Sequence, residues 1–252
     1  MTAPAIDLRG LAHRYADGTP ALRGVDLRIE AGEAVAIVGA NGAGKSTLLL
    51  HLNGLLLPGS GSVAIEGSPV SRATLVAVRQ RVGYVFQDAD DQLFMPTVQD
   101  DVAFGPLNQG LPATEVQRRV ADALAAVGAE HLAARAPYRL SGGEKRAVAI
   151  AGVLAMAPAI LVLDEPSAGL DPAGRRRLIQ LLSRLPQTRV IATHDLDLVL
   201  ELCPRVVVLH QGRVAADGAP RKVFADVELL QRCHLEPPLG GLVPSPAGAV
   251  VQ

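Results

Sequence analysis

The sequence predicts an α/β fold with a mostly parallel sheet, and three features of the pattern lead to it. The chain up to Ile65 is rich in strand patterns, and residues 88–156 turn to apolar residues at helical spacing. Beyond residue 160, short apolar runs alternate with amphipathic stretches, as parallel strands joined by helices do. With 252 residues, 49% hydrophobic and 19% charged, the chain is long enough for one large or two modest domains.

In chain order, strands come first. Apolar runs bounded by turn residues predict them at 6–15, 22–29, 34–38, 62–65 and 82–86. In the middle, apolar residues from Val116 to Val127 recur at helical spacing, and a second helix is expected to start near Ser141. The alternating part then predicts strands at 160–163, 190–193 and 206–210, and helices at 173–185 and 196–202. From Glu236 onward, prolines and glycines predict an irregular tail.

Composition and charge exclude some functions. The formal net charge is -1, which gives no reason to expect a nucleic-acid surface. The one basic run, 175–177, lies among apolar residues at helical spacing and is interpreted as the solvated face of a helix. Cys203 and Cys233 lack metal or redox spacing, so we expect them to be small buried residues in a reducing compartment.

No membrane span or leader is expected from the sequence. Residues 147–163 carry no charge, but Gly152 and Pro158 interrupt them and the run is slightly short for a span. We interpret it as a buried helix followed by a central strand. Residues 1–9 have no apolar signal region. Any membrane role is therefore expected to act through a partner.

Residues 39–47, Gly-Ala-Asn-Gly-Ala-Gly-Lys-Ser-Thr, have the pattern of a phosphate-binding loop between a strand and the helix-favouring run 48–52. The glycines allow a tight turn that points N–H groups at phosphate oxygens. Lys45 adds positive charge for the β- and γ-phosphates, and the Ser46 hydroxyl can bind a Mg²⁺ that bridges them. The alternative is a chance match in a glycine-rich turn. The residues assigned to the nucleotide here are Gly39, Asn41, Gly42, Ala43, Gly44, Lys45, Ser46 and Thr47.

Two adjacent carboxylates, Asp164 and Glu165, follow the apolar run 160–163. The carboxyl edge of an open α/β sheet is where ligands bind. Because successive strand residues face opposite ways, we expect different roles: Asp164 in the Mg²⁺ shell, and Glu165 beside the γ-phosphate, where it orients or deprotonates the attacking water. A strand that merely ends in a polar turn is the alternative, and the phosphate loop favours the functional interpretation.

A third motif is Leu-Ser-Gly-Gly-Glu-Lys at 140–145. Ser141 and Glu144 fit a capping box, which is a common structural helix start. Gly142 and Gly143 leave N–H groups uncovered at the positive end of a helix, a geometry suited to a second phosphate contact.

Taken together, the segments 39–47, 140–145 and 160–165, followed by Ser-Ala-Gly-Leu-Asp at 167–171 and by His194, resemble the ATP-binding-cassette ATPases. The resemblance covers about residues 6–218 in one continuous order. It implies a phosphate-loop NTPase fold with a mostly parallel core sheet, an N-terminal antiparallel β subdomain and a helical subdomain at about 88–156. It also implies ATP and Mg²⁺ as ligands, an ATPase domain at 1–218 and a short C-terminal extension at 219–252.

Further roles come only from this resemblance. Tyr15 matches the aromatic residue that stacks on adenine, although an aromatic residue at a strand end is an ordinary feature. Gln87 matches the family's glutamine that senses Mg²⁺ and the attacking water; the alternative is that Gln87 is an ordinary glutamine in a turn. His194 matches the switch histidine that contacts the γ-phosphate, and Asp171 matches the inter-subunit aspartate. Glu144 departs from the commoner glutamine, and we expect it to cap its helix and face away from phosphate.

The resemblance also implies a dimer, because the Ser141 segment of one cassette contacts the nucleotide held by Lys45 of another. Residues 85–108 and 52–56 look like the energy-coupling-factor transporters, closest to the cobalt and nickel uptake ATPases. This implies a membrane coupling subunit and a membrane substrate-binding subunit, at the cytoplasmic face of a bacterial membrane. Apolar residues among acids beyond Gln87 suit docking of a partner helix; a solvated acidic loop is the alternative.

Other functions remain open from the sequence. The importer could carry a vitamin such as biotin instead of a metal, and the second cassette could be a paralogue. A soluble cassette ATPase acting on DNA or ribosomes usually carries tandem cassettes, coiled coils or basic patches, and these features are missing here. A phosphate-loop kinase would lack the 140–145 motif and His194.

Overall fold

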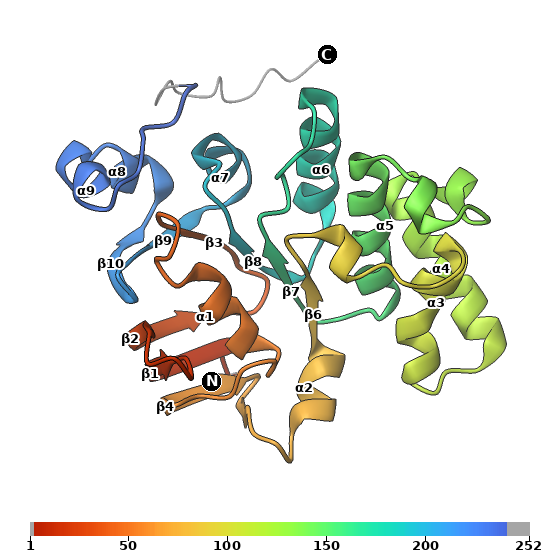
Figure 1. Ribbon diagram of the computed structural model, residues 1–252, viewed down its shortest axis with the longest axis horizontal. Helices are drawn as coiled ribbons and strands as arrows, with labels where there is room; N and C mark the ends of the chain where they lie inside the picture. The colour runs from red at the N-terminus through yellow and green to blue at the C-terminus, as the bar shows by residue number, and fades with distance from the viewer. Residues whose placement is uncertain (1–2, 241–252) are drawn as a thin grey trace.

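The computed structural model describes residues 3–240, and within that range the strands form two sheets (Figure 1). The smaller sheet is antiparallel, with the order β2-β1-β4-β5. Its strands are β1 (Ile6–Arg14), β2 (Pro20–Ile29), β4 (Ser60–Ile65) and β5 (Ser68–Pro69). The strand-rich opening of the chain and the antiparallel β subdomain are thus confirmed.

The larger sheet has the order β10-β9-β3-β8-β7-β6 among the described residues. Its strands are β3 (Ala34–Val38), β6 (Val82–Val85), β7 (Ile160–Asp164), β8 (Thr188–Ala192), β9 (Arg205–His210) and β10 (Arg213–Gly218). Neighbouring strands are parallel except β10, which runs antiparallel to β9. The predicted parallel sheet is confirmed. β10 was not expected, because its sequence is short of apolar residues and both faces stay partly exposed.

Helices cover both faces of this sheet and form a separate lobe (Figure 1). The helices that were expected are α1 (Lys45–Leu52), α4 (Ala113–Val127), α5 (Gly142–Ala155), α6 (Pro172–Arg184) and α7 (Leu196–Leu202). The helices that were not individually expected are α2 (Leu75–Arg81), α3 (Val98–Asn108), α8 (Pro220–Phe224) and α9 (Val227–Arg232). Three of these four are short, so their apolar residues complete too few turns to show a period.

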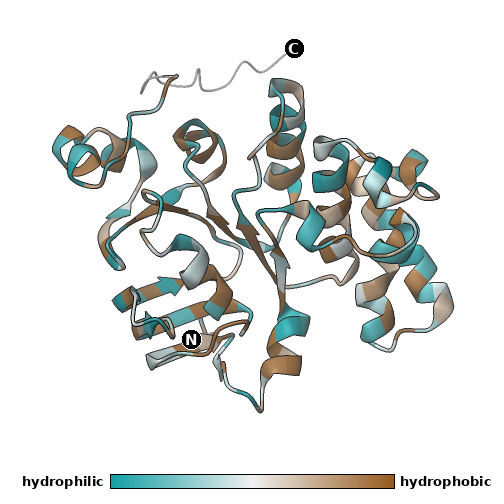
Figure 2. Ribbon diagram, in the orientation of Figure 1, coloured by the Kyte–Doolittle hydropathy of each residue, from teal (hydrophilic) through white to brown (hydrophobic). Residues whose placement is uncertain are grey.

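Three hydrophobic clusters hold the chain together. One joins the antiparallel sheet and α1 to one face of the larger sheet, and a second joins the other face to α6, α7, α8 and α9. The third lies among α3, α4 and α5 and forms the core of the helical lobe. Figure 2 shows the central strands as nearly continuous hydrophobic ribbons, as expected for strands buried on both faces. In residues 3–240, none of the helices is both long enough and apolar enough to cross a membrane.

The uncharged run, the cysteines and the basic run lie in well-defined places in the structure. The run 147–163 is the end of α5 followed by β7, as interpreted from Pro158. Cys203 and Cys233 are buried free thiols, as expected. The basic run 175–177 does lie on α6, but it is not all solvated: Arg175 is half-buried and pairs with two carboxylates. This part of the prediction is wrong because α7 packs beside α6 and supplies acidic partners.

Strand register places the candidate site residues at one edge. Ile37 in β3 and Asp164 in β7 both pair with Ala192 in β8, and Val85 in β6 pairs with Leu163. The parallel strands β3, β8, β7 and β6 therefore end at about the same level. The loops that follow them, which begin at Gly39, Glu165, Thr193 and Phe86, leave the sheet side by side.

Candidate active site

The phosphate-loop motif links β3 directly to α1, in the predicted order. Gly42 and Gly44 have φ values of 78° and 105°, the left-handed region that glycine occupies without strain. A Cβ on Gly44 would lie 2.6 Å from the Ala21 carbonyl oxygen, so β2 requires glycine there. Gly44 is the N-cap of α1, and its side-chain-free backbone leaves the helix N-terminus open to an anion.

Lys45 is the cation at this helix end. Its side chain is only 8% exposed, and its Nζ donates to the carbonyl oxygen of Gly39 at 2.7 Å. The same Nζ lies 3.9 Å from Glu165 Oε1. A buried ammonium needs such partners, because an unpaired charge in the interior is costly. The lysine is therefore held over the loop, facing the carboxylate that follows β7.

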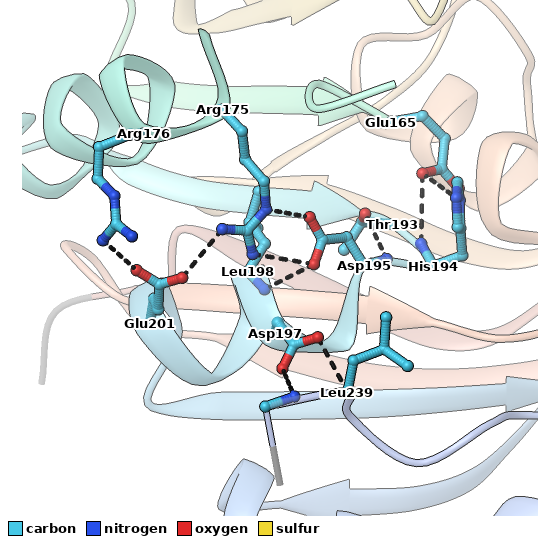
Figure 3. Close-up of polar contacts among 11 residues, drawn as sticks. Glu165, Arg175, Arg176, Thr193, His194, Asp195, Asp197, Leu198, Glu201 and Leu239 are labelled. Atoms are coloured by element: carbon cyan, nitrogen blue, oxygen red, sulfur yellow. Dashed lines mark hydrogen bonds and ion pairs between the residues drawn. The ribbon is translucent and has the colours of Figure 1, made fainter. Parts of the chain in front are cut away.

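Glu165 lies between Lys45 and His194. Its carboxylate Oε2 is 2.9 Å from His194 Nδ1 and accepts the His194 backbone N–H at 3.3 Å (Figure 3). Its own backbone N–H donates to the Ala192 carbonyl. Glu165 has a φ of 45°, outside the strand conformation. The alternation of side chains along β7 therefore ends at Asp164. The left-handed turn at Glu165 lets both carboxylates, Asp164 and Glu165, face the phosphate loop from the end of one strand.

Asp164 is the more buried oxygen donor. Its Oδ2 accepts the Tyr84 hydroxyl at 3.2 Å, while its Oδ1 is buried without a hydrogen-bond partner in the structure. Burial raises the pKa of Asp164, and the hydroxyls of Ser46 and Tyr84 act against that rise. An unpaired buried carboxylate oxygen close to a serine hydroxyl is the donor set that a hard divalent cation binds.

Lys45, Glu165 and His194 line a cleft of about 430 Å³. Tyr15 is 40% exposed, and its hydroxyl shares a 2.8 Å hydrogen bond with Thr47 Oγ1. The cleft is lined by Tyr15, Thr19, Pro20, Ala21, Asn41, Gly42, Ala43, Gly44, Lys45, Ser46, Thr47, Gln87, Glu165 and His194. Most residues assigned from the sequence therefore come together. Gly39 and Asp164 are not among the lining residues, and a Cβ on Gly39 would clash with the Leu209 carbonyl oxygen.

Gln87 follows β6 and is exposed at the mouth of the cleft. The backbone on either side is held from the helical lobe: Arg146 of α5 donates to the carbonyl oxygens of Phe86 and Gln87 at 2.6 and 2.5 Å. Arg146 is 6% exposed, and burial lowers its pKa from the ordinary value. The position of Gln87 thus depends on a residue that belongs to another lobe.

Ser141 and Asp171 have their polar contacts elsewhere. Ser141 caps α5: its hydroxyl accepts the Glu144 N–H, and Glu144 accepts the Ser141 N–H at 2.7 Å. The predicted capping box is confirmed. Ser141, Gly142 and Gly143 are exposed. Asp171 caps α6 by accepting the Gly174 N–H at 2.6 Å. None of these four is among the described residues that line the 430 Å³ cleft.

Sequence reasoning missed Tyr84 and Arg146. Tyr84 sits on a predicted strand, and its polar tip within an apolar run was the available signal. For Arg146 the sequence offers no signal, because its two acceptors are backbone carbonyls 60 and 59 residues earlier in the chain.

Known proteins resemble this chain over nearly its whole length. A putative ABC transporter ATP-binding protein of Geobacter sulfurreducens is 63% identical over 239 residues, which cover 95% of this chain and 96% of that protein. The energy-coupling factor transporter ATP-binding protein EcfA of Methanothermobacter thermautotrophicus is 53% identical over 238 residues, 92% of this chain and 76% of that protein.

Solved structures agree with these relatives. The structure of cbiO1 from Clostridium perfringens, described as part of the ABC transporter complex cbiONQ, has a TM-score of 0.81 and 44% identity, and the match covers 91% of this chain and 94% of that one. A dimeric post-hydrolysis structure of the cassette MJ0796, bound to ADP and Pi, has a TM-score of 0.77 and 30% identity over 85% of this chain and 98% of that one.

The fold is thus that of an ABC ATPase, a phosphate-loop NTPase with an added antiparallel sheet. A family model described as ABC transporter matches residues 22–168, which include the phosphate loop, the Ser141 turn and both carboxylates. On this match and these relatives, the chain belongs to the ABC transporter family, as an ATP-binding subunit whose ATP hydrolysis is coupled to transport.

Proposed function

We propose that this chain is the ATPase subunit of an energy-coupling-factor importer that takes up cobalt or nickel through membrane subunits. The observation that carries the hydrolytic role is the Glu165 carboxylate, held between Lys45 and His194 beside the phosphate loop. The relatives named EcfA and the structure of cbiO1 support the transporter class. The ATPase domain would span residues 1–218 and include the helical subdomain at about 88–156. Residues 219–252 would form a short C-terminal extension.

In the proposed reaction, the loop N–H groups and Lys45 bind the β- and γ-phosphates, and Tyr15 stacks on adenine. Glu165 orients the attacking water and accepts its proton, which requires a basic group within hydrogen-bond distance. His194 would hydrogen-bond the γ-phosphate from the exposed side of Glu165. The 2.9 Å separation of His194 Nδ1 and Glu165 Oε2 supports a joint role of the two side chains at the γ-phosphate.

Ser46, Asp164 and Gln87 would hold a Mg²⁺ ion. The unpartnered Asp164 Oδ1 and the nearby Ser46 hydroxyl support this assignment, because Mg²⁺ binds carboxylate and hydroxyl oxygens together with phosphate oxygens. The ion would neutralise charge that develops on the phosphates. Asp164 must be ionised for this role, and the hydroxyl of Tyr84 favours the ionised form.

A second cassette, either another copy of this chain or a paralogue, would complete the site. The exposed Ser141, Gly142 and Gly143 would contact the nucleotide held by the partner, with Asp171 at the interface. Their exposure at the N-terminal end of α5, where Gly142 and Gly143 carry no side chains, supports this arrangement. Closure of the two cassettes on ATP would supply the motion that drives transport.

The contact with the membrane subunits would lie on the helical lobe, beyond Gln87. Phe94, Phe104 and Leu107 are 63%, 43% and 56% exposed, and the two phenylalanine rings meet edge to face at 4.9 Å. Exposed aromatic clusters of this kind mark interaction surfaces. The protein would then act at the cytoplasmic face of a bacterial membrane, bound only through its partners, and would not bind nucleic acid.

The test is co-purification from detergent-solubilised membranes. The wild-type chain is expected to recover a coupling subunit and a substrate-binding subunit, and the Phe94→Ser/Leu107→Ser variant is expected to lose both while keeping ATPase activity. Val76→Ser, which alters an exposed apolar residue on α2, is the control. Uptake of labelled cobalt, nickel and biotin by cells that express the complex then identifies the cargo. Recovery of soluble partners alone would contradict the proposal.

A further inference from the structure

Arg175, in the first turn of α6, forms a two-pronged ion pair with Asp195, the residue after His194 (Figure 3). Arg175 Nε lies 2.7 Å from Asp195 Oδ2, and Arg175 Nη2 lies 3.0 Å from Asp195 Oδ1. The two side chains are 24% and 19% exposed. Paired donors that match both carboxylate oxygens fix orientation as well as distance.

Asp195 is also tied to its own segment. Its Oδ1 accepts the Leu198 N–H at 2.8 Å and so caps α7, and its backbone N–H donates to Thr193 Oγ1 at 3.0 Å. Thr193 is fully buried. The backbone is therefore held on both sides of His194. The His194 side chain is 70% exposed, and the polar contacts recorded for it in residues 3–240 go to Glu165.

Charge keeps this arrangement in place. Burial works to raise the pKa of Asp195, but the hydrogen bonds from Arg175 and Leu198 outweigh it and hold the pKa below the ordinary value. Asp195 thus stays ionised beside Arg175. Removing the arginine would leave a half-buried carboxylate without its counter-charge, and the segment would rearrange to reach water.

We propose that Arg175 is a positioning residue for ATP hydrolysis, which aligns His194 with Glu165 by holding Asp195. The inference rests on the proposed role of His194. Arg175 acts through the 193–195 backbone and not on the nucleotide. Because Asp171 caps the same helix, the proposed contact with the second cassette and the orientation of His194 share one rigid element.

Arg175→Met and its neighbour Arg176→Met form a matched pair. Both arginines pair with Glu201, but in the described part of the chain only Arg175 also pairs with Asp195. Arg175→Met is expected to lower kcat for ATP hydrolysis at least about tenfold with KM for ATP nearly unchanged, since a small misplacement of a catalytic group costs rate. Arg176→Met is expected to keep wild-type kcat. Wild-type kcat in Arg175→Met would overturn the proposal.

The deciding measurement repeats the substitution in a His194→Ala background. If Arg175 acts through His194, Arg175→Met should cause no further loss there, because residues that act as a unit are not additive. A full additional tenfold loss would overturn the proposal while leaving His194 catalytic. Wild-type kcat in His194→Ala alone would instead refute the role of His194 and this inference with it.

Arg175→Lys and Asp195→Asn cover the case in which Arg175→Met does not fold. Lysine keeps the charge but not the two-pronged contact, so a smaller loss of kcat is expected. Asparagine can still cap α7 but carries no charge, so it should also lower kcat. Melting temperatures of all variants separate loss of positioning from loss of folding. Folded Lys and Asn variants that both have wild-type kcat would overturn the proposal.

Discussion

At the scale of single residues, Glu165 adopts a conformation that its side chain does not favour. A non-glycine residue with a φ of 45° is strained by about 1–3 kcal/mol. The Glu165 N–H bond to the Ala192 carbonyl and the contacts of its carboxylate with Lys45 and His194 maintain that conformation. Strain of this kind concentrates where a side chain must be aimed, here at the loop opposite.

Replacing Glu165 by glutamine should separate binding from hydrolysis. Glu165→Gln keeps the size and can still accept the hydrogen bond from the His194 backbone N–H, but an amide cannot take a proton from water. We expect kcat to fall by about 10²-fold or more, while ATP binding measured by calorimetry is kept. Glu30→Gln, an exposed residue paired with Arg28, is the control and should hydrolyse normally. Wild-type turnover in Glu165→Gln would show that another group is the base.

Asp101 is a buried carboxylate in the helical lobe, away from Asp164 and Glu165. Its Oδ1 accepts the N–H groups of Phe94 and Met95 at 3.0 Å each, and its Oδ2 is buried without a partner in the structure. Burial raises the pKa of Asp101, and the two hydrogen bonds only partly offset it. Asp101 thereby stabilises the turn that carries Phe94, although burial makes the charged form of its carboxylate unfavourable.

Asp101 makes the stability of the folded protein depend on pH. The folded protein binds the Asp101 proton more tightly than the unfolded chain does, so its contribution to stability is present at low pH and is lost as pH rises through the raised pKa. Asp101→Asn can keep both hydrogen bonds without the charge. The free energy of unfolding of Asp101→Asn minus that of wild type, both measured by urea unfolding, should therefore be larger near neutral pH than near the ordinary pKa of aspartate. Asp122→Asn, at an exposed pair, should show no such trend.

At the scale of elements, α5 links the two parts of the molecule. It packs against α3 and α4 in the core of the helical lobe, and it also contacts β6. Arg146 holds the carbonyls of Phe86 and Gln87, and Gln92 bridges the same segment by accepting the Phe86 N–H and donating to the Ala149 carbonyl. A movement of α5 would therefore displace Gln87.

Arg146→Met should test this link. The substitution leaves two partly buried carbonyls without their donor, so we expect a loss of about 1 kcal/mol in the free energy of unfolding. It should also lower kcat, because Gln87 is no longer held at the mouth of the cleft. Arg118→Met, which removes an exposed arginine from α4 in the same lobe, should change neither quantity appreciably. An active Arg146→Met variant would show that Gln87 is positioned by other contacts.

At the scale of the whole molecule, the phosphate loop and the Ser141 turn belong to different lobes. The loop joins β3 to α1, while Ser141 begins α5 in the helical lobe (Figure 1). The Ser141 turn is not part of the lining of the 430 Å³ cleft in the same chain. The proposed site is complete only when two chains meet.

Association should therefore depend on nucleotide and on Ser141. Glu165→Gln with ATP is expected to elute as a dimer in size-exclusion chromatography with light scattering, and as a monomer without ATP. Adding Ser141→Arg should abolish the dimer, because a long cation replaces the small cap at the interface, and the lost cap should cost only about 1 kcal/mol of stability. Val76→Arg on α2 should leave the dimer intact. A dimer that forms equally without ATP would contradict nucleotide-driven closure.

The strand, loop and helix of the phosphate site, the α5 capping box and the parallel sheet could all be predicted from the amino-acid sequence, because each rests on local periodicity or on glycine and capping chemistry. The sequence could not reveal that Glu165 turns left-handed, that Tyr84 serves Asp164, or that Arg146 and Arg175 hold Gln87 and Asp195. These contacts depend on how distant parts of the chain pack together. They join residues on different strands and helices, and the register of the parallel strands, which no short stretch of sequence encodes, brings them within hydrogen-bond distance.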